Sequence, residues 1–241
     1  MSREDRVDVR VPKVSRELSM LAFNARVLYE AQDRRTPLLD RFRFLGIVQA
    51  NLDEFYGIRV SGIREQIDAG VRSRSADGRT PTEQMQAIRE ATQLLAEAQQ
   101  ETWRALVEEL GAEGTQLVEW ADLDAAVQAR LSARFMQEVF PVLTPLAVDP
   151  KFPFPHISSL SLSIAVRLRD PERGVELFAR VKVPQIIGRL VHVGDGRVLL
   201  LEGLIREHLH ELFAGHEVVD AHLFRITRDA DIEVEEGEAD D

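Results

Sequence analysis

The sequence has no cysteine and no long apolar run, and each absence excludes a class of protein. Without cysteine there are no disulfides, thiolate metal sites or cysteine nucleophiles, which fits a cytoplasmic chain. No apolar run approaches the ~18 residues that a membrane-spanning helix needs. The first thirteen residues, MSREDRVDVRVPK, lack the apolar core of a secretory signal. We therefore expect a cytoplasmic protein without a transmembrane segment, and leave peripheral attachment to a membrane open.

Positive charge is also scarce. Lysine and arginine number 30 against 41 aspartate and glutamate residues, for a formal net charge of −11 at pH 7. Aromatic and basic residues are not interleaved on any one predicted face, as they are in many nucleic-acid binders. The sequence therefore argues against nucleic acid as a partner, and only a local basic patch could hold another polyanion.

Motifs for metals and for common catalytic sites are missing as well. The spacing HExxH, the phosphate loop GxxxxGK[ST] and the nucleophile elbow GxSxG do not occur. The histidines show no ligand spacing, so we expect no metal site in this chain. The six are His156, His192, His208, His210, His216 and His222.

The first half of the sequence has the periodicity of helices. Ser15 can cap a first helix, and Thr36 followed by proline indicates the start of a second. A third helix is predicted from near Asn51 to about Ala69, and a fourth from Thr82 to the glycines at 111–114 after a polar loop.

The second half changes to the period of strands. Residues 160–168 alternate strictly between apolar and polar, and 177–184 follow a turn as their partner, which predicts a hairpin. Residues 190–200 suggest a second hairpin, 201–213 a helix and 217–229 a last strand. Residues 141–155 hold five prolines and are predicted to be an extended loop.

We predict an α+β protein, with an all-helical N-terminal domain before a mixed α+β head domain that has antiparallel strands. The expected limits are a disordered or extended tail at 1–14, the helical domain at 15–110 and the head domain at 111–241. Because the last residues are acidic and supply no closing core element, we expect the head domain to be truncated at its end.

Asn51 has two interpretations. Asparagine is a preferred helix N-cap, and Glu54 three residues later completes the pattern of a capping box. A capping asparagine uses its carbonyl oxygen and leaves its amide hydrogens free, which could meet the ring nitrogens of a purine. A phosphate is a poorer guest, because Asp53 and Glu54 oppose the attraction of the helix dipole for anions.

One basic stripe is predicted against the acidic background. Six basic residues lie on or beside the polar faces of the predicted strands, and they could form a solvated face or a contact surface for phosphate chains. The sequence alone leaves both interpretations open. They are Arg167, Arg169, Arg180, Lys182, Arg225 and Arg228.

Four segments together resemble the long-chain polyphosphate kinase family. They occur in the order RELSMLAFNARVLYEA, PLLDRFRFLGIVQANLDEFYGIRVSGI, VFPVLTPLAVDPKFPFPHISSLSLSIAV and FRITRDADIEVEE. The similarity runs from about Arg16 to the last residue. It implies the N-terminal part of an enzyme that transfers the terminal phosphate of ATP reversibly to inorganic polyphosphate, through a phosphohistidine and with magnesium.

The resemblance also implies roles for this part of the enzyme. The family's asparagine in the NLDEF motif contacts the nucleotide, and this position is Asn51 here. The head domain is expected to form dimer contacts, so the partners are ATP or ADP, polyphosphate and a second copy or a higher homo-oligomer. None of the histidines matches the phosphorylated motif, so we expect no catalytic residue in this chain and no turnover by it alone.

Two departures from the family pattern, Met20 for a usual tryptophan and Gln49–Ala50 for a more polar pair, leave Asn51 in place. The alternative is a stand-alone, non-catalytic interaction or regulatory module derived from the same enzyme. The sequence does not decide among an expressed piece, a truncated gene product and a split gene, nor does it indicate polyphosphate length or reaction direction.

Overall fold

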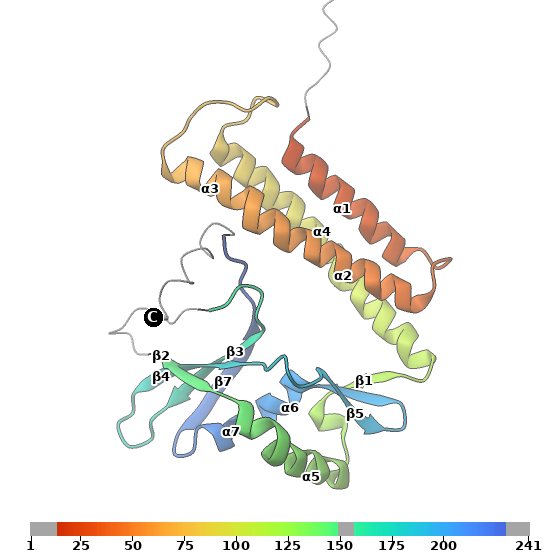
Figure 1. The fold of residues 1–241 in the computed structure, drawn as a ribbon, viewed down its shortest axis with the longest axis vertical. Helices are drawn as coiled ribbons and strands as arrows, with labels where there is room; N and C mark the ends of the chain where they lie inside the picture. Colours follow the sequence, from red (N-terminus) through yellow and green to blue (C-terminus); the bar gives the residue numbers. More distant parts are fainter. Residues whose placement is uncertain (1–13, 149–156, 230–241) are drawn as a thin grey trace, which may run out of the picture. The chain divides into compact units, whose positions relative to one another are not determined.

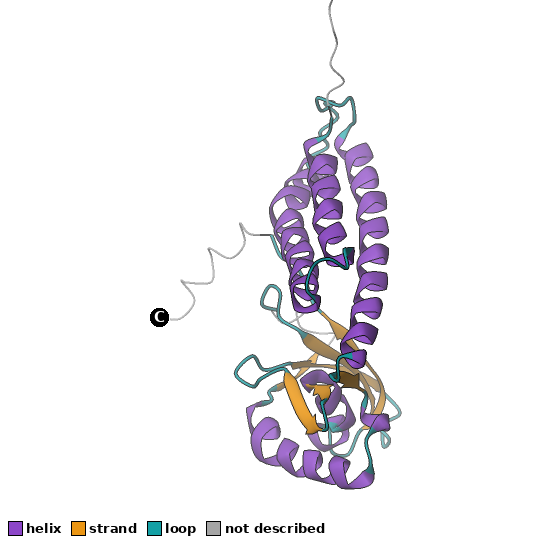
Figure 2. Ribbon diagram, turned by 90° about the vertical axis from the view of Figure 1, so that its right-hand side faces the viewer, coloured by secondary structure: helices purple, strands orange, loops and turns teal. Residues whose placement is uncertain are grey.

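The computed structural model describes residues 14–148 and 157–229, which divide into two compact units between Leu106 and Val107 (Figure 1). The first unit is helical and the second contains the strands, as the colouring by secondary structure shows (Figure 2). The predicted α+β class, with a helical region before a domain of antiparallel strands and helices, is confirmed. The predicted limits 15–110 and 111–241 stay predictions.

The helical unit begins with a helix hairpin. Helix α1 spans Arg16–Gln32 and α2 spans Leu38–Glu54, and the two helices pack against each other. Ser15 caps α1 by accepting a hydrogen bond from the backbone N–H of Leu18 at 3.2 Å, as predicted. Pro37, not Thr36, is the N-cap residue of α2. Proline suits this place because its missing N–H would have no helical partner there.

The third predicted helix does not begin at Asn51. Helix α2 runs on to Glu54, a π-helical turn η1 follows at Phe55–Val60, and α3 continues at Ser61–Asp68. Asn51 lies inside this continuous helical segment, so the prediction that it is an N-cap is wrong. The helix continues because buried residues on both sides of Asn51, such as Val48 and Phe55, face the same core.

Helix α4, Pro81–Ala112, completes the helical unit after the predicted polar loop. Thr80 and Glu83 form a reciprocal cap at its start, since each accepts a hydrogen bond from the other's backbone N–H. The core of the unit is a stripe from each helix. It comprises Leu21, Leu28, Ala31, Leu45, Val48, Leu52, Phe55, Val60, Ile63, Met85, Ile88, Leu95 and Leu106.

The second unit contains two sheets. In the three-stranded sheet, β6 (Arg197–Leu200) lies between β1 (Gln116–Val118), which is parallel to it, and β5 (Leu190–Gly194), which is antiparallel. In the four-stranded antiparallel sheet the order is β2, β4, β3, β7. These strands are Pro145–Val148, Glu176–Lys182, Ser163–Arg169 and Glu217–Phe224.

Both predicted hairpins are confirmed, β3 with β4 and β5 with β6. The first starts later than predicted, at Ser163, because Leu160 adopts a positive φ of 57° in a turn and is 44% exposed. The proline-rich stretch contains strand β2, and residues 149–156 of that predicted loop lie outside the described residues. The acidic end at 230–241 lies outside them too.

Short helical segments cover the core of this unit. They are α5 (Ala125–Arg134) with its π-helical extension η3 (Phe135–Val139), 3-10 turns at Trp120–Asp122 and Phe140–Val142, α6 (Leu201–Glu207) and α7 (Leu209–Leu212). The single helix predicted at 201–213 breaks at His208, whose ring turns inward to bind Ser132 and the Leu204 carbonyl. Ile164, Val166 and Leu168 of β3 enter the core, so the opposite face of the four-stranded sheet carries its polar residues.

Candidate functional site

Asn51 forms a polar pair between two helices. Its Nδ2 donates to Oδ1 of Asn24 on α1 at 2.8 Å. Asn24 is only 2% exposed, whereas Asn51 is half-buried. The pair therefore stands at the edge of the helical core, with Asn24 on the inner side.

Asn24 was missed as a predicted site residue, although the sequence carries a signal for it. The buried positions of α1 are Leu21, Asn24, Leu28 and Ala31, at helical spacing. Asn24 is the one polar residue in that stripe. A buried amide needs a hydrogen-bond partner, so its position indicates a polar contact with a facing helix.

The amide of Asn51 keeps unused hydrogen-bonding capacity. Among the described residues, its second Nδ2 hydrogen and its Oδ1 have no partner. An amide in this state offers one donor and one acceptor together, which is the pattern that asparagine uses to bind the edge of adenine. The contact with Asn24 holds the side chain in one orientation, so less freedom is lost on binding.

The surroundings of Asn51 favour an uncharged ligand group. Ile47, one turn before Asn51 on α2, is 45% exposed. Asp53 and Glu54 follow Asn51 closely, and Asp53 accepts a hydrogen bond from Gln49 at 3.0 Å. These acids repel phosphate, while the apolar side chain of Ile47 suits a nucleotide base.

The helix changes its hydrogen-bond pattern immediately after this pair. The N–H of Phe55 bonds to the carbonyls of both Asn51 and Leu52, and the N–H of Ser61 bonds to Tyr56 five residues earlier. Single π-helical turns inside α-helices occur frequently at functional sites. The wider turn lets Phe55 remain in the core at 1% exposure while Asn51 stays at the edge.

The six residues of the predicted basic stripe differ in whether they form ion pairs. Arg167 of β3 pairs with Asp220 and with Glu176, the latter at 3.6 Å. Arg169 pairs with Glu217 at 3.2 Å and with Glu176 at 3.9 Å. This end of the sheet is therefore a solvated face of balanced charge. Arg225 and Arg228, beyond β7, also have partners.

The remaining two members differ. Arg180 and Lys182 of β4 have no acidic partner among the described residues. Arg180 is buried and Lys182 is exposed. The structure thus gathers the unneutralised charge of the predicted stripe at one end of β4.

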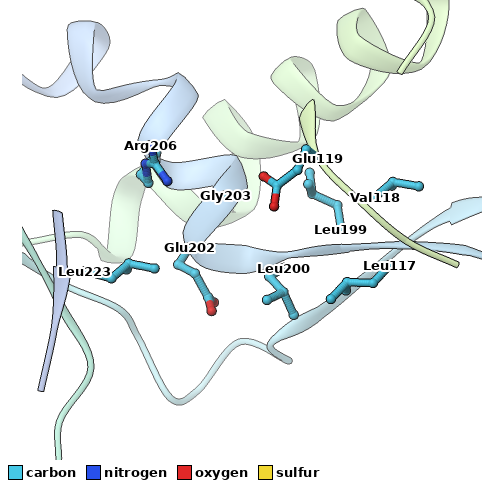
Figure 3. A pocket seen from close by; sticks show the side chains of 9 residues that line it. All are labelled: Leu117, Val118, Glu119, Leu199, Leu200, Glu202, Gly203, Arg206 and Leu223. Carbon is cyan, nitrogen blue, oxygen red and sulfur yellow. The ribbon is translucent and has the colours of Figure 1, made fainter. Parts of the chain in front are cut away.

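A small cavity of about 80 Å³ lies within the second unit, where β1, β6 and α6 meet (Figure 3). Nucleotide pockets hold several hundred Å³, so this cavity is too small for that role. Its one fully buried acid, Glu202, is neutralised by Arg189, whose Nε donates at 3.0 Å. The lining residues are Leu117, Val118, Glu119, Leu199, Leu200, Glu202, Gly203, Arg206 and Leu223.

His208 is the buried histidine of the described chain, and its contacts are structural. Nδ1 faces the Leu204 carbonyl at 2.9 Å and Nε2 faces the Ser132 hydroxyl at 2.8 Å. The ring stacks on Phe135 with centroids 4.4 Å apart. Because both ring nitrogens are occupied, His208 is poorly placed to act as a nucleophile.

The described ranges contain neither a metal-binding cluster nor a membrane-spanning helix. In residues 14–148 and 157–229, no three side chains of aspartate, glutamate or histidine come together around a point where a metal ion could bind. No helix in these ranges has the length and apolar character needed to cross a bilayer.

Comparison with known proteins gives consistent matches along the chain. A family model described as the polyphosphate kinase N-terminal domain matches residues 13–118, and one described as the polyphosphate kinase middle domain matches residues 126–241. Polyphosphate kinase of Mycobacterium ulcerans is 50% identical over 240 residues, which covers 95% of this chain and 32% of that protein. Polyphosphate kinase of Mycobacterium tuberculosis strain H37Rv is 49% identical, with 95% and 33% covered.

A solved structure agrees with these matches. The crystal structure of polyphosphate kinase from Porphyromonas gingivalis superposes with a TM-score of 0.80 at 31% identity, covering 92% of this chain and 34% of that chain. The chain thus spans about a third of the length of the relatives that it matches.

Proposed function

The chain belongs to the polyphosphate kinase family, whose N-terminal and middle domains it carries, and we propose that it forms the part of such an enzyme that holds the base of ATP. The reaction proposed is reversible transfer of the terminal phosphate of ATP to inorganic polyphosphate. Asn51 is the residue proposed to contact the nucleotide.

The observation that carries the proposal is the state of the Asn51 amide. One hydrogen is used by Asn24, and a donor and an acceptor remain for a ligand. Adenine presents an amino group beside a ring nitrogen, so a single amide can satisfy both. The exposed Ile47, one turn before Asn51, offers apolar surface beside the base.

Charge separates the base from the phosphates in this proposal. Asp53 and Glu54 lie next to Asn51, so the triphosphate extends away from this end of α2. The described residues bring no set of metal ligands together, so we assign magnesium no step within them. Magnesium and the phosphohistidine would act elsewhere in a longer enzyme. Assembly with a second copy stays a prediction.

The test is the ATP requirement of a chimera in which this chain replaces the matching third of the Mycobacterium tuberculosis enzyme. Asn51→Leu removes both the free donor and the free acceptor, and we expect it to raise the KM for ATP roughly tenfold, since a good bidentate contact contributes about 1–3 kcal/mol. The KM for polyphosphate should change little.

Asn24→Leu is the matched control, because it removes the same hydrogen bond between α1 and α2 but leaves the Asn51 amide in place. We expect its KM for ATP to rise less than about threefold, while both variants lower Tm. Equal rises in KM for the two variants would mean that Asn51 acts only in helix pairing, and the proposal would fail.

A further inference from the structure

Among the described residues, Arg180 is a buried cation without a counter-charge. Its side chain is on β4, and the residue is only 8% exposed. Nε donates to the Ser163 hydroxyl at 3.0 Å, and Nη2 is closed off from solvent with no partner in the described part of the chain. Nη1 is not closed off in this way, so it is the guanidinium nitrogen left for a ligand.

The residues in line with Arg180 on the neighbouring strands are not acidic. Leu146 of β2 and Ala165 of β3 lie directly beside it in the register, and His222 of β7 lies beyond Ala165. Burial alone lowers the pKa of Arg180, with no carboxylate to oppose that shift. A buried charge that lacks a partner is costly, and a bound anion would remove that cost.

A second cation lies at the same end of the sheet face. Lys182 is directly opposite Ser163 in the register and two residues from Arg180 on β4, so the two cations share one face about 7 Å apart along the strand. Lys182 is exposed and has no partner among the described residues. Ser163 is fully buried and its hydroxyl accepts from Arg180, so it positions the guanidinium and does not itself reach a ligand.

The basic residues at the opposite end of the face already have acidic partners. There Arg167 and Arg169 are exposed and are neutralised by Asp220, Glu176 and Glu217. Guanidinium groups bind phosphate through parallel N–H bonds, but only when no carboxylate already occupies them. The unoccupied donors therefore mark one place on a face that is otherwise charge-balanced.

We propose that Arg180, positioned by Ser163, and Lys182 bind a phosphate group of a polyphosphate chain. The choice of polyphosphate over another phosphate compound rests on the proposed function. Two cations on one face suit an oxyanion with several acceptor oxygens. A nucleotide triphosphate and free orthophosphate share that chemistry, so the experiment includes them.

The experiment measures binding of long-chain polyphosphate, orthophosphate and ATP to the 241-residue chain by titration calorimetry at one fixed ionic strength. Arg180→Met and Arg167→Met each remove one positive charge from the same sheet face. We expect Arg180→Met to weaken polyphosphate binding at least tenfold and Arg167→Met to weaken it less than twofold. Lys182→Gln, at an exposed position that does not threaten folding, should weaken it about threefold.

Equal effects of the Arg180 and Arg167 variants, or no effect of Lys182→Gln, would overturn the inference. Dependence on Arg180 for ATP but not for polyphosphate would overturn the assignment of the ligand. Asn51→Leu should leave polyphosphate binding unchanged. If Arg180→Met leaves polyphosphate binding unchanged while Asn51→Leu raises the KM for ATP, this phosphate site is refuted and the proposed function still holds.

Discussion

At the scale of single residues, the hydrogen bond between Asn51 and Asn24 joins two helices and leaves part of one amide unused. Asn24 is buried and needs a donor, and Asn51 supplies it from the facing helix. The remaining donor and acceptor of Asn51 have no partner among the described residues. The structural role of Asn51 is compatible with the binding role that we propose, because the two would use different atoms of the same amide.

The resemblance of the NLDEF motif predicted Asn51 as a nucleotide contact, which stays a prediction, whereas the helix-cap role predicted from local spacing is wrong. The pattern of asparagine with glutamate three residues later is typical of a helix start. A contact with Asn24, 27 residues away in sequence, instead occupies the amide. Local spacing does not reveal this partner, although the polar residue inside the buried stripe of α1 indicates that one exists.

The basic residues likewise depend on partners that are distant in sequence. Alternation along the strands correctly places Arg167 and Arg180 on the face opposite the core. Their different states depend on strands far away in sequence, since Asp220 of β7 neutralises Arg167, whereas no acid in the described part of the chain pairs with Arg180. Register between distant strands was not predictable from either strand alone.

Asp124 permits a prediction about pH. It caps α5 by accepting a hydrogen bond from the backbone N–H of Val127 at 2.9 Å, and this bond holds the pKa of its carboxyl below the usual range. A lowered folded-state pKa adds stability above the ordinary carboxyl pKa, and that stability is lost as the pH falls through the folded-state value. Asn also caps helices but does not titrate.

We therefore expect the Tm of Asp124→Asn to lie below that of the unmodified chain at pH 7, and the gap to narrow as the pH falls below about 4. Thermal unfolding followed by circular dichroism between pH 7 and pH 2 measures the difference in Tm between the two proteins. Other carboxyl groups contribute equally to both proteins and cancel in the comparison. A gap that stays constant over this range would contradict the stated role of the charge.

At the scale of elements, two helices contain π-helical turns, Phe55–Val60 after α2 and Phe135–Val139 after α5. Each turn buries a phenylalanine completely, Phe55 and Phe135. Periodicity of 3.6 predicts the helices but not these turns, because one extra residue per turn leaves most of the apolar pattern unchanged. The strand pairs were easier to predict, since alternation and short turns are both local signals.

The contact between β1 and β6 depends on a glycine. Gly196 has φ +70°, and a Cβ placed there would lie 2.0 Å from the carbonyl oxygen of Gly114. The N–H of Gln116 bonds to the Gly196 carbonyl at 2.9 Å beside this close approach. A side chain at residue 196 would thus push the start of β1 away from β6.

We expect Gly196→Ala to lower the free energy of unfolding by roughly 2 kcal/mol or more, from backbone strain and the clash together. Gly188→Ala is the matched control, because no atom lies within 4 Å of its added Cβ and its φ is not positive. Its effect should stay within about 0.5 kcal/mol. Urea unfolding measures the stability of both variants. Equal urea midpoints for Gly196→Ala and Gly188→Ala would contradict the prediction, because they would show that the backbone at residue 114 can move away from an added Cβ at residue 196.

At the scale of the whole molecule, the chain combines two units with separate cores and a net charge of −11. Such a charge repels a polyanion in general, so a phosphate chain must be held at a local site. Two places of different chemistry are proposed as binding sites: the amide of Asn51 beside the exposed Ile47, and the unneutralised donors at Arg180. The first suits a base and the second suits a phosphate.

The central claim is that this chain works as one third of a polyphosphate kinase, and the intact mass of the protein isolated from its source tests it most directly. The matched relatives are about three times as long as this chain, whose mass is 27.3 kDa. We expect a mass near three times that value, with the sequence of this chain contained in it. A mass of 27.3 kDa would contradict the claim and favour a separate, non-catalytic module.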